Sequence, residues 1–126
     1  MNDPISDMLA RIKNGYLARH KKVQIPYSKV NEAVAQKLSR LGYIGKIEPK
    51  SSGKFSLYLN FSDGVPALTD IKRISRLGRR MYVKSKGLIK IRHRLGYLIL
   101  TTPKGIKTHQ EAIKEKLGGE LICAVW

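Results

Sequence analysis

The residues best suited to chemistry lie in the last quarter of the chain, in two turns on either side of a short predicted helix. The first turn consists of Thr101, Thr102, Pro103, Lys104 and Gly105, in which the two threonines carry hydroxyls and the lysine carries an ammonium group. The second turn consists of Gly118, Gly119 and Glu120. Hydroxyls, ammonium groups and unpaired backbone amides bind phosphates and ribose hydroxyls. The segment therefore predicts an RNA contact, although an ordinary loop and a glycine helix cap are the alternatives.

A second group of candidates lies in the middle of the chain. Ten basic side chains fall between Lys72 and Arg94, among them Arg79 and Arg80. Such a run is often only a solvated face, but together with a net charge of +16 it predicts attraction to phosphates. Tyr82 follows directly, and its ring is suited either to stacking on an unpaired base or to filling a sheet face.

An enzyme is the sharpest alternative, and the sequence gives it little support. The three histidines, His20, His93 and His109, lack metal-ligand spacing, and no HExxH, GxSxG, phosphate-binding or dinucleotide motif is present. Each histidine is expected at the surface. Cys123, the only cysteine, lies in an apolar run and is expected to be a buried hydrophobe. We therefore expect no catalysis, no cofactor, no metal and no small-molecule substrate.

Length and composition limit the number of domains and the class of binding partner. The 126 residues, 42% of them hydrophobic, suffice for one ordinary domain or two very small ones. The sequence pI of about 10.2 is typical of a polyanion binder. No apolar run approaches the roughly 20 residues of a membrane span, and the N-terminus lacks the layout of a secretory signal. A cytoplasmic protein with no membrane partner is expected.

Helical periodicity predicts how the first half presents its charges. Asp3 is the expected N-cap of a first helix, which leaves Arg11 and Lys13 facing solvent or phosphate. Ser28 caps a second predicted helix that begins with Lys29 and stops at Gly42. A short strand at residues 23–25 separates the helices, and residues 43–48 and 55–61 are expected to form a β-hairpin.

The predicted fold class is α/β of the α+β type, with two small subdomains. Residues 63–66 are the expected linker, so that the N-terminal α-β-α-β-β subdomain covers residues 1–63 and the RNA-binding, β-rich subdomain covers residues 64–126. Their net charges are +6 and +10. In the second, strands are expected at 71–75, 80–83 and 97–100, and one short helix from Thr108, a capping-box residue, to Gly118. Residues 88–95 are ambiguous between helix and loop.

Motifs along the whole chain are shared with one known family. They are Asp3-Pro4-Ile5-Ser6-Asp7-Met8-Leu9, Arg11-Ile12-Lys13-Asn14, Ser28-Lys29, Gly42-Tyr43-Ile44, Arg73-Ile74-Ser75-Arg76-Leu77-Gly78 with Arg80 and Tyr82, and the ending from Thr101 to Ile106, Thr108, Glu111-Ala112 and Gly118 to Cys123. With them the chain resembles the bacterial small-subunit ribosomal protein eight family (uS8). It departs from the family at Pro103, usually a serine, and at Leu77, Ile89, Arg94 and Lys107.

The resemblance implies a structural, monomeric protein of the 30S subunit. It implies direct binding to the central domain of 16S rRNA early in assembly, which helps to organise the platform, and contacts with ribosomal proteins five and twelve. The loop of Thr101, Thr102 and Pro103 would bind an irregular RNA helix, and the first N-terminal helix and the start of the second would contact neighbouring RNA. Two alternatives are repression of its own messenger RNA and nonspecific compaction of DNA.

Overall fold

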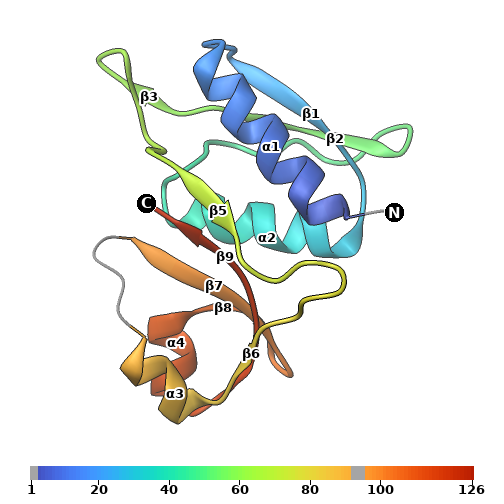
Figure 1. Ribbon diagram of the computed structural model, residues 1–126. Helices are drawn as coiled ribbons and strands as arrows, with labels where there is room; N and C mark the ends of the chain where they lie inside the picture. The colour runs from blue at the N-terminus through green and yellow to red at the C-terminus, as the bar shows by residue number, and fades with distance from the viewer. Residues whose placement is uncertain (1–2, 92–95) are drawn as a thin grey trace. The chain divides into compact units, whose positions relative to one another are not determined.

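A computed structural model describes residues 3–91 and 96–126 (Figure 1). The chain forms two compact units, Met1–Asp70 and Ile71–Trp126, called here the first and second units. Each combines helices with antiparallel strands, which confirms the α+β class. Among the described residues, no helix is both long and apolar enough to cross a lipid bilayer.

Two capped helices frame the first unit. Helix α1 spans Pro4–Leu17, and the Asp3 carboxylate caps it by accepting from the Ser6 backbone N–H at 3.1 Å and the Ser6 hydroxyl at 2.6 Å. Helix α2 spans Lys29–Arg40, with the Ser28 hydroxyl accepting from the Asn31 N–H at 3.1 Å. Both predicted helix starts are confirmed, because a cap depends only on residues three positions apart.

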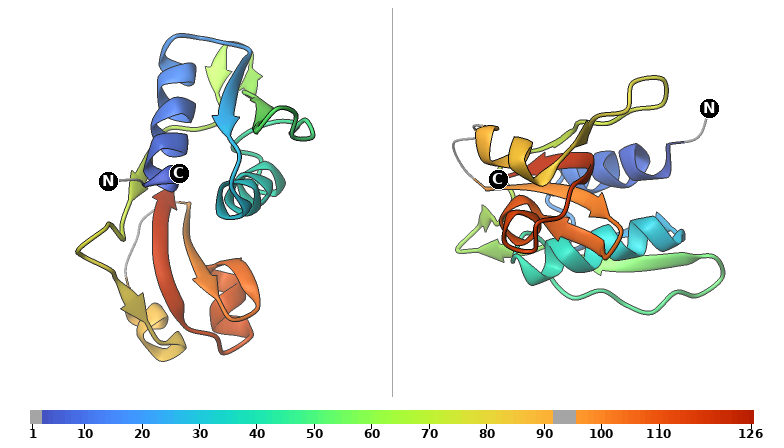
Figure 2. Two further views of the ribbon diagram at one scale, coloured as in Figure 1. Left: turned by 90° about the vertical axis from the view of Figure 1, so that its right-hand side faces the viewer. Right: turned by 90° about the horizontal axis from the view of Figure 1, so that it is seen from below.

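Strand β1 (Lys22–Pro26) pairs antiparallel with β2 (Lys54–Tyr58), and we call this pair the β1–β2 ribbon. Figure 2 shows α1 lying beside β1. The predicted hairpin of residues 43–48 with 55–61 is present in part, because Ile47 and Leu57 form an antiparallel bridge and Ser51 and Lys54 close the turn. Residues 45–48 run along the other edge of β2 through single hydrogen bonds, such as Gly45 N–H to the Tyr58 carbonyl at 2.8 Å, without forming a regular strand.

The expected linker at residues 63–66 instead belongs to a hairpin. Strands β3 (Phe61–Ser62) and β4 (Val65–Pro66) pair antiparallel, and Asp63 and Gly64 turn the chain with φ of 51° and 79°. An Asp-Gly pair with both φ values positive is the preferred two-residue hairpin turn, because its twist matches that of the strands. The hairpin lies within the first unit, and the division after residue 63 remains a prediction.

The second unit is a sheet with β9 (Gly119–Val125) at its centre. The strand order is β5-β9-β7-β8, and β6 also pairs with β9. The other strands are β5 (Ile71–Arg73), β6 (Tyr82–Val83), β7 (Tyr97–Thr102) and β8 (Gly105–Thr108). The predicted strands at 71–75, 80–83 and 97–100 are thus present in part or in full, whereas β8 was not predicted and β9 was expected only as an apolar run.

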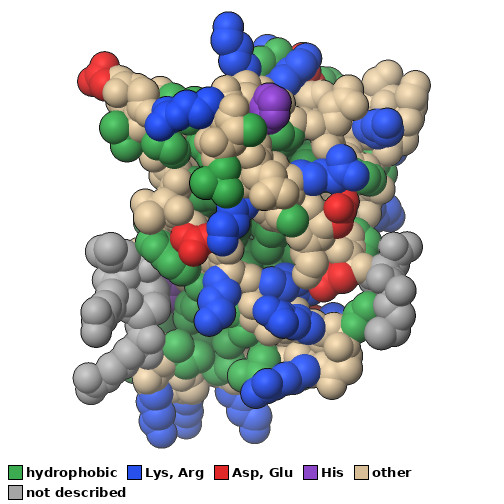
Figure 3. Space-filling view, turned by 45° about the horizontal axis from the view of Figure 1, so that its top comes forward, with side chains coloured by type: hydrophobic (Ala, Val, Ile, Leu, Met, Phe, Trp, Pro, Cys, Tyr) green, Lys and Arg blue, Asp and Glu red, His purple; other side chains and the backbone are tan. Residues whose placement is uncertain are grey.

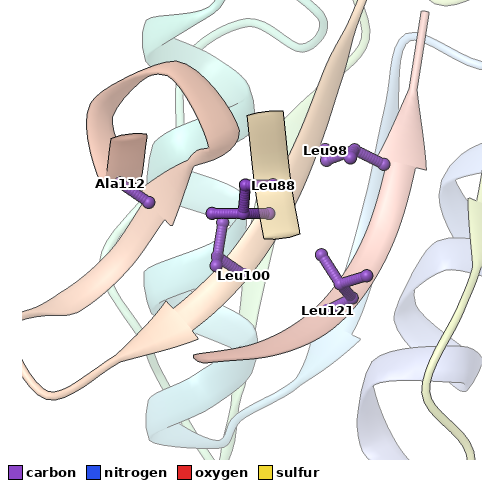
Figure 4. Close-up of a cluster of buried hydrophobic side chains, with 5 residues drawn as sticks. All are labelled: Leu88, Leu98, Leu100, Ala112 and Leu121. Carbon is purple, nitrogen blue, oxygen red and sulfur yellow. The ribbon is translucent and has the colours of Figure 1, made fainter. Parts of the chain in front are cut away.

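Two helices pack on this sheet, where the sequence predicted one. They are α3 (Ser85–Lys90) and α4 (His109–Lys114), which lie side by side (Figure 1). Figure 4 shows the core between them and the strands, formed by Leu88, Leu98, Leu100, Ala112 and Leu121. Helix α3 resolves the start of the ambiguous segment 88–95; residues 92–95, with His93, lie outside the described residues.

The capping box of α4 is confirmed, but its end and one histidine differ from expectation. The Thr108 hydroxyl accepts from the Glu111 N–H at 3.2 Å, and the Glu111 carboxylate accepts from the Thr108 N–H at 2.9 Å. The helix ends at Lys114, and Lys116 (φ 57°) turns the chain before Gly118. His109 was expected at the surface but is only 8% exposed. Its burial is tolerated because its Nδ1 accepts the Leu98 backbone N–H at 3.1 Å. His20 is exposed as expected.

Cys123 lies fully buried in β9, as the sequence predicted. Burial raises the pKa of its thiol to about 12, against a smaller lowering by Arg73. A thiol that stays protonated at neutral pH is a poor nucleophile, so Cys123 is a core residue.

Tyr16 ties three segments of the first unit together. Burial raises the pKa of its phenol, so the hydroxyl keeps its proton and donates to the Tyr43 carbonyl at 2.5 Å. The same oxygen accepts the Asn60 backbone N–H at 3.0 Å. Helix α1 is thereby joined to the end of α2 and to the segment after β2.

We predict that Tyr16→Phe lowers the free energy of unfolding by about 1–3 kcal/mol, because both backbone groups lose a part-buried partner while the ring is retained. Urea unfolding measures this, with the exposed Tyr82→Phe as the control. Equal stability of the two variants would contradict the role of the hydroxyl.

Candidate nucleic-acid interface

The hydroxyl-bearing turn is the tip of the β7–β8 hairpin. Thr102 pairs with Gly105, so Pro103 and Lys104 form a two-residue loop. The Thr102 hydroxyl donates to the Gly105 carbonyl at 2.8 Å and accepts the Lys104 N–H at 3.1 Å. Its single proton is therefore used inside the turn. Pro103 is exposed and suits the first loop position, since its ring fixes a φ that common turns require there.

Thr101 is placed differently from Thr102. Its side chain is half-buried and makes no hydrogen bond with any other residue that the structure describes. Because Leu100 points into the core and successive side chains alternate along a strand, Thr101 points to the opposite face of the sheet. Its hydroxyl retains both donor and acceptor capacity for a ligand.

Three predicted site residues form one row across the strands. Thr101 on β7 is directly opposite Glu120 on β9, and Glu120 is directly opposite Tyr82 on β6. The Tyr82 side chain is not a filler of the sheet core, because the residue is 71% exposed. We call Thr101, Glu120 and Tyr82 the cross-strand row. Residues about 20 positions apart along the chain are thus brought onto one face of the sheet.

The two glycines make this arrangement possible. A Cβ on Gly119 would lie 1.8 Å from the Thr101 carbonyl oxygen, and one on Gly118 would lie 2.6 Å from the Val83 carbonyl oxygen. Both contacts are impossible for any other residue. The two glycines therefore allow neighbouring segments of this chain to pack closely against each other. That they also allow a ligand backbone to approach remains a prediction.

A hollow of about 480 Å³ lies beside the cross-strand row. Its lining consists of Tyr82, Val83, Lys84, Ser85, Lys116, Gly118 and Gly119. Sequence reasoning missed Lys84, Ser85 and Lys116 as site residues, although each lies within a few positions of Tyr82 or Gly118. The hollow combines an aromatic ring, two ammonium groups and a hydroxyl, which suits a nucleotide.

The two arginines before Tyr82 have different surroundings. Arg80 Nη1 lies 2.9 Å from Glu120 Oε2, and the Glu120 side chain is only 15% exposed. Arg79 closes the turn with Arg76 through its backbone, and its exposed side chain has no partner among the described residues. Arg80 therefore positions Glu120, whereas the Arg79 guanidinium is available to a phosphate.

Most candidates of the first unit are already engaged within it. The Arg11 side chain pairs with Asp7 at 3.0 Å, and Lys13 pairs with Asp70 at 2.8 Å. Asp3 and Ser28 are the helix caps described above. Lys29 is exposed at the start of α2. Surface ion pairs are weak, so Arg11 and Lys13 can exchange their carboxylates for phosphates at little cost.

Figure 3 shows one face of the molecule, on which Lys and Arg side chains are spread widely and acidic ones are few. In the part of the chain that the structure describes, no group of His, Cys, Asp and Glu is arranged to hold a metal ion. Fold, charge and cross-strand row together define a small, strongly basic α+β protein with a surface suited to a polyanion.

Comparison with known proteins identifies the family. The family profile described as Ribosomal protein S8 matches residues 3–126. Over the whole chain, 44% of residues are identical to the small ribosomal subunit protein uS8 of Dictyoglomus turgidum, of which 98% is covered. The proteins of the same name from Lawsonia intracellularis and Nitratidesulfovibrio vulgaris (strain Miyazaki F) are 43% and 40% identical, each with the whole chain and 99% of the relative covered.

The chain therefore belongs to the ribosomal protein S8 family, as the resemblance predicted. This is a family of structural proteins of the small ribosomal subunit and not of enzymes.

Because the Thr102 hydroxyl makes two internal hydrogen bonds and the Thr101 hydroxyl makes none with the described residues, we predict that substitutions at these two positions change stability by different amounts. Thr102→Val removes two hydrogen bonds of the hairpin turn and should lower the free energy of unfolding by about 1 kcal/mol. Thr101→Val, the matched control, should leave it within about 0.5 kcal/mol, since no internal bond is lost. Thermal or urea unfolding of both variants measures this, and equal losses would refute the assignment.

Proposed function

We propose that this protein binds small-subunit rRNA directly, in the central domain of 16S rRNA, and helps to assemble the platform of the 30S subunit in the bacterial cytoplasm. The cross-strand row is the observation that carries the proposal. An unpartnered hydroxyl on Thr101, an exposed aromatic ring on Tyr82 and a hollow with Lys84 and Lys116 lie together on one unit. Family membership supports the same function.

Each part of the row has a distinct role in this proposal. The Thr101 hydroxyl and the amides of the hairpin tip bind ribose hydroxyls and phosphates, the groups by which irregular RNA helices are recognised. Tyr82 stacks on an unpaired base beside the hollow. Glu120, fixed by Arg80, accepts a hydrogen bond from a ribose or a base instead of meeting a phosphate.

The Thr102 hydroxyl contributes indirectly. Its proton is used by Gly105, so it holds the amides of Lys104 and its neighbours in position. Contacts by Lys29, Arg11 and Lys13 with an adjacent RNA segment would add affinity without sequence preference. Contacts with ribosomal proteins five and twelve are part of the same proposal.

Binding to a transcript of the 16S central domain tests the proposal. We expect Thr101→Val to weaken binding about five- to tenfold, because an interface hydrogen bond of about 1 kcal/mol is lost while the fold is retained. Filter binding against a scrambled RNA and a DNA duplex of equal length gives the specificity. Equal affinity for all three nucleic acids would refute specific rRNA binding, and unchanged binding by the variant would refute the role of Thr101.

The unequal surroundings of the two arginines predict unequal salt effects. Arg79→Gln should reduce the slope of log K against log salt by about 0.7–0.9, the value for one lost phosphate contact. Arg80→Gln should change the slope less, because Arg80 is paired with Glu120, and should reduce the preference for the cognate RNA. Titrations at several salt concentrations measure both. Identical slopes for the two variants would contradict this division.

A further inference from the structure

The solvent-facing side of the β1–β2 ribbon has a composition that the proposed site does not explain. Ile25 and Leu57 are buried on one side of this ribbon. Because side chains alternate along a strand, the opposite side carries the other six residues of the same strands. These are Lys22, Gln24, Pro26, Lys54, Ser56 and Tyr58. One side of the ribbon is therefore core, and the other is a basic, hydroxyl-bearing surface.

Aromatic rings hold the lysines of this surface in position. The Nζ atoms of Lys22 and Lys46 each lie 5.7 Å from the centre of the Tyr58 ring. At the end of the ribbon, Lys50 Nζ lies 4.1 Å from the centre of the Tyr27 ring. A cation held on a ring keeps its N–H donors directed to solvent but has lost part of its rotamer freedom. Less entropy is then lost when it binds a phosphate.

A polar hollow of about 540 Å³ lies beside the ribbon, and its lining includes Glu48, the ion-pair partner of Lys22, and Pro49 and Ser51, the chain neighbours of Lys50. Its lining includes Gln24, Ser51, Ser52 and Ser56, whose side chains make no hydrogen bond with any residue in the ranges 3–91 and 96–126. Lys54 lines it as well, and Glu48, the acidic residue of the lining, lies 3.6 Å from Lys22. Hydroxyls and an amide without partners can donate to and accept from ribose hydroxyls.

We propose that this side of the β1–β2 ribbon, together with the end of the ribbon that carries Lys50, is a second RNA-backbone contact, in which Lys22, Lys46 and Lys50 bind phosphates and the hollow accepts ribose 2′-hydroxyls. The proposal rests on the proposed function but assigns residues outside the cross-strand row. RNA fits better than a run of acidic side chains, because a ribose 2′-hydroxyl both donates and accepts, as the serine hydroxyls and the Gln24 amide do, whereas an ionised carboxylate only accepts.

Lysine acetylation of the full-length protein, read by mass spectrometry, tests the surface directly. The protein is treated free, in complex with the 16S central-domain transcript, and with polyglutamate at equal charge concentration. We expect the RNA to lower the reactivity of Lys46, Lys50 and Lys54 at least about fivefold and polyglutamate to protect them less. Lys114, exposed on α4 and outside the basic run of residues 72–94, is the internal control and should react equally in all samples.

The possible results separate the two proposals. Protection of Lys104 and Lys116 without Lys46 and Lys50 would overturn the second contact and leave the proposed function standing. Protection of neither set would overturn rRNA binding itself. Equal protection of the ribbon lysines by RNA and polyglutamate would assign the surface to acidic polymers in general and overturn its assignment to RNA.

Substitutions give an independent readout. Lys46→Gln with Lys50→Gln should weaken binding to the same transcript about tenfold and reduce the salt slope by about 1.5, from two phosphate contacts. Arg40→Gln with Lys114→Gln, which removes the same charge at exposed positions with no assigned RNA contact, should change binding less than twofold. Tyr58→Leu keeps the charge but removes the ring and should weaken binding two- to fivefold at an unchanged salt slope. Wild-type affinity of both ribbon variants would overturn the proposal.

Discussion

Strand β9 can occupy the centre of the second unit only because Gly119, at its start, has no side chain. The Thr101 carbonyl takes the space that a Cβ would need, and Gly118 meets the Val83 carbonyl in the same way. This close approach lets β9 pair with β6 on one side and β7 on the other. The cross-strand row, the hollow beside Tyr82 and the core under Leu121 all depend on it.

Internal hydrogen bonding divides the site into groups that bind and groups that support. Thr102 and Arg80 are committed to the turn and to Glu120, whereas Thr101, Tyr82 and Arg79 keep capacity for a ligand. A hydroxyl has a single proton, so a threonine that closes a turn cannot also donate to a phosphate. Neighbouring residues of the same type therefore have different roles in the proposed function.

In the first unit, basic side chains are restrained in two ways, by aromatic rings and by ion pairs. Lys46 and Lys50 lie over tyrosine rings with no carboxylate partner among the described residues, and Arg11 and Lys13 are paired with carboxylates. Lys22 has both a ring and a carboxylate, that of Glu48. Both arrangements restrain long side chains, but the ring leaves the charge uncompensated. Basic residues on rings are therefore better prepared for a polyanion than those in ion pairs, even where the sequence presents all of them as equivalent surface lysines and arginines.

The sequence by itself determined the features that depend on neighbours along the chain: the caps Asp3, Ser28 and Thr108, the helices that they begin, and the charge of each half. It also indicated all three residues of the cross-strand row as candidates, but not that they lie side by side. Only the tertiary structure decided which strands pair, since it added β1 to the edge of β2 opposite residues 45–48, and it placed His109 in the core and separated Thr101 from Thr102. A cap or a helical stripe is fixed within a few residues, whereas strand pairing depends on groups far apart in the chain. The acceptor of the Thr102 proton is only three residues away, but the turn that presents it forms because β7 pairs with β8.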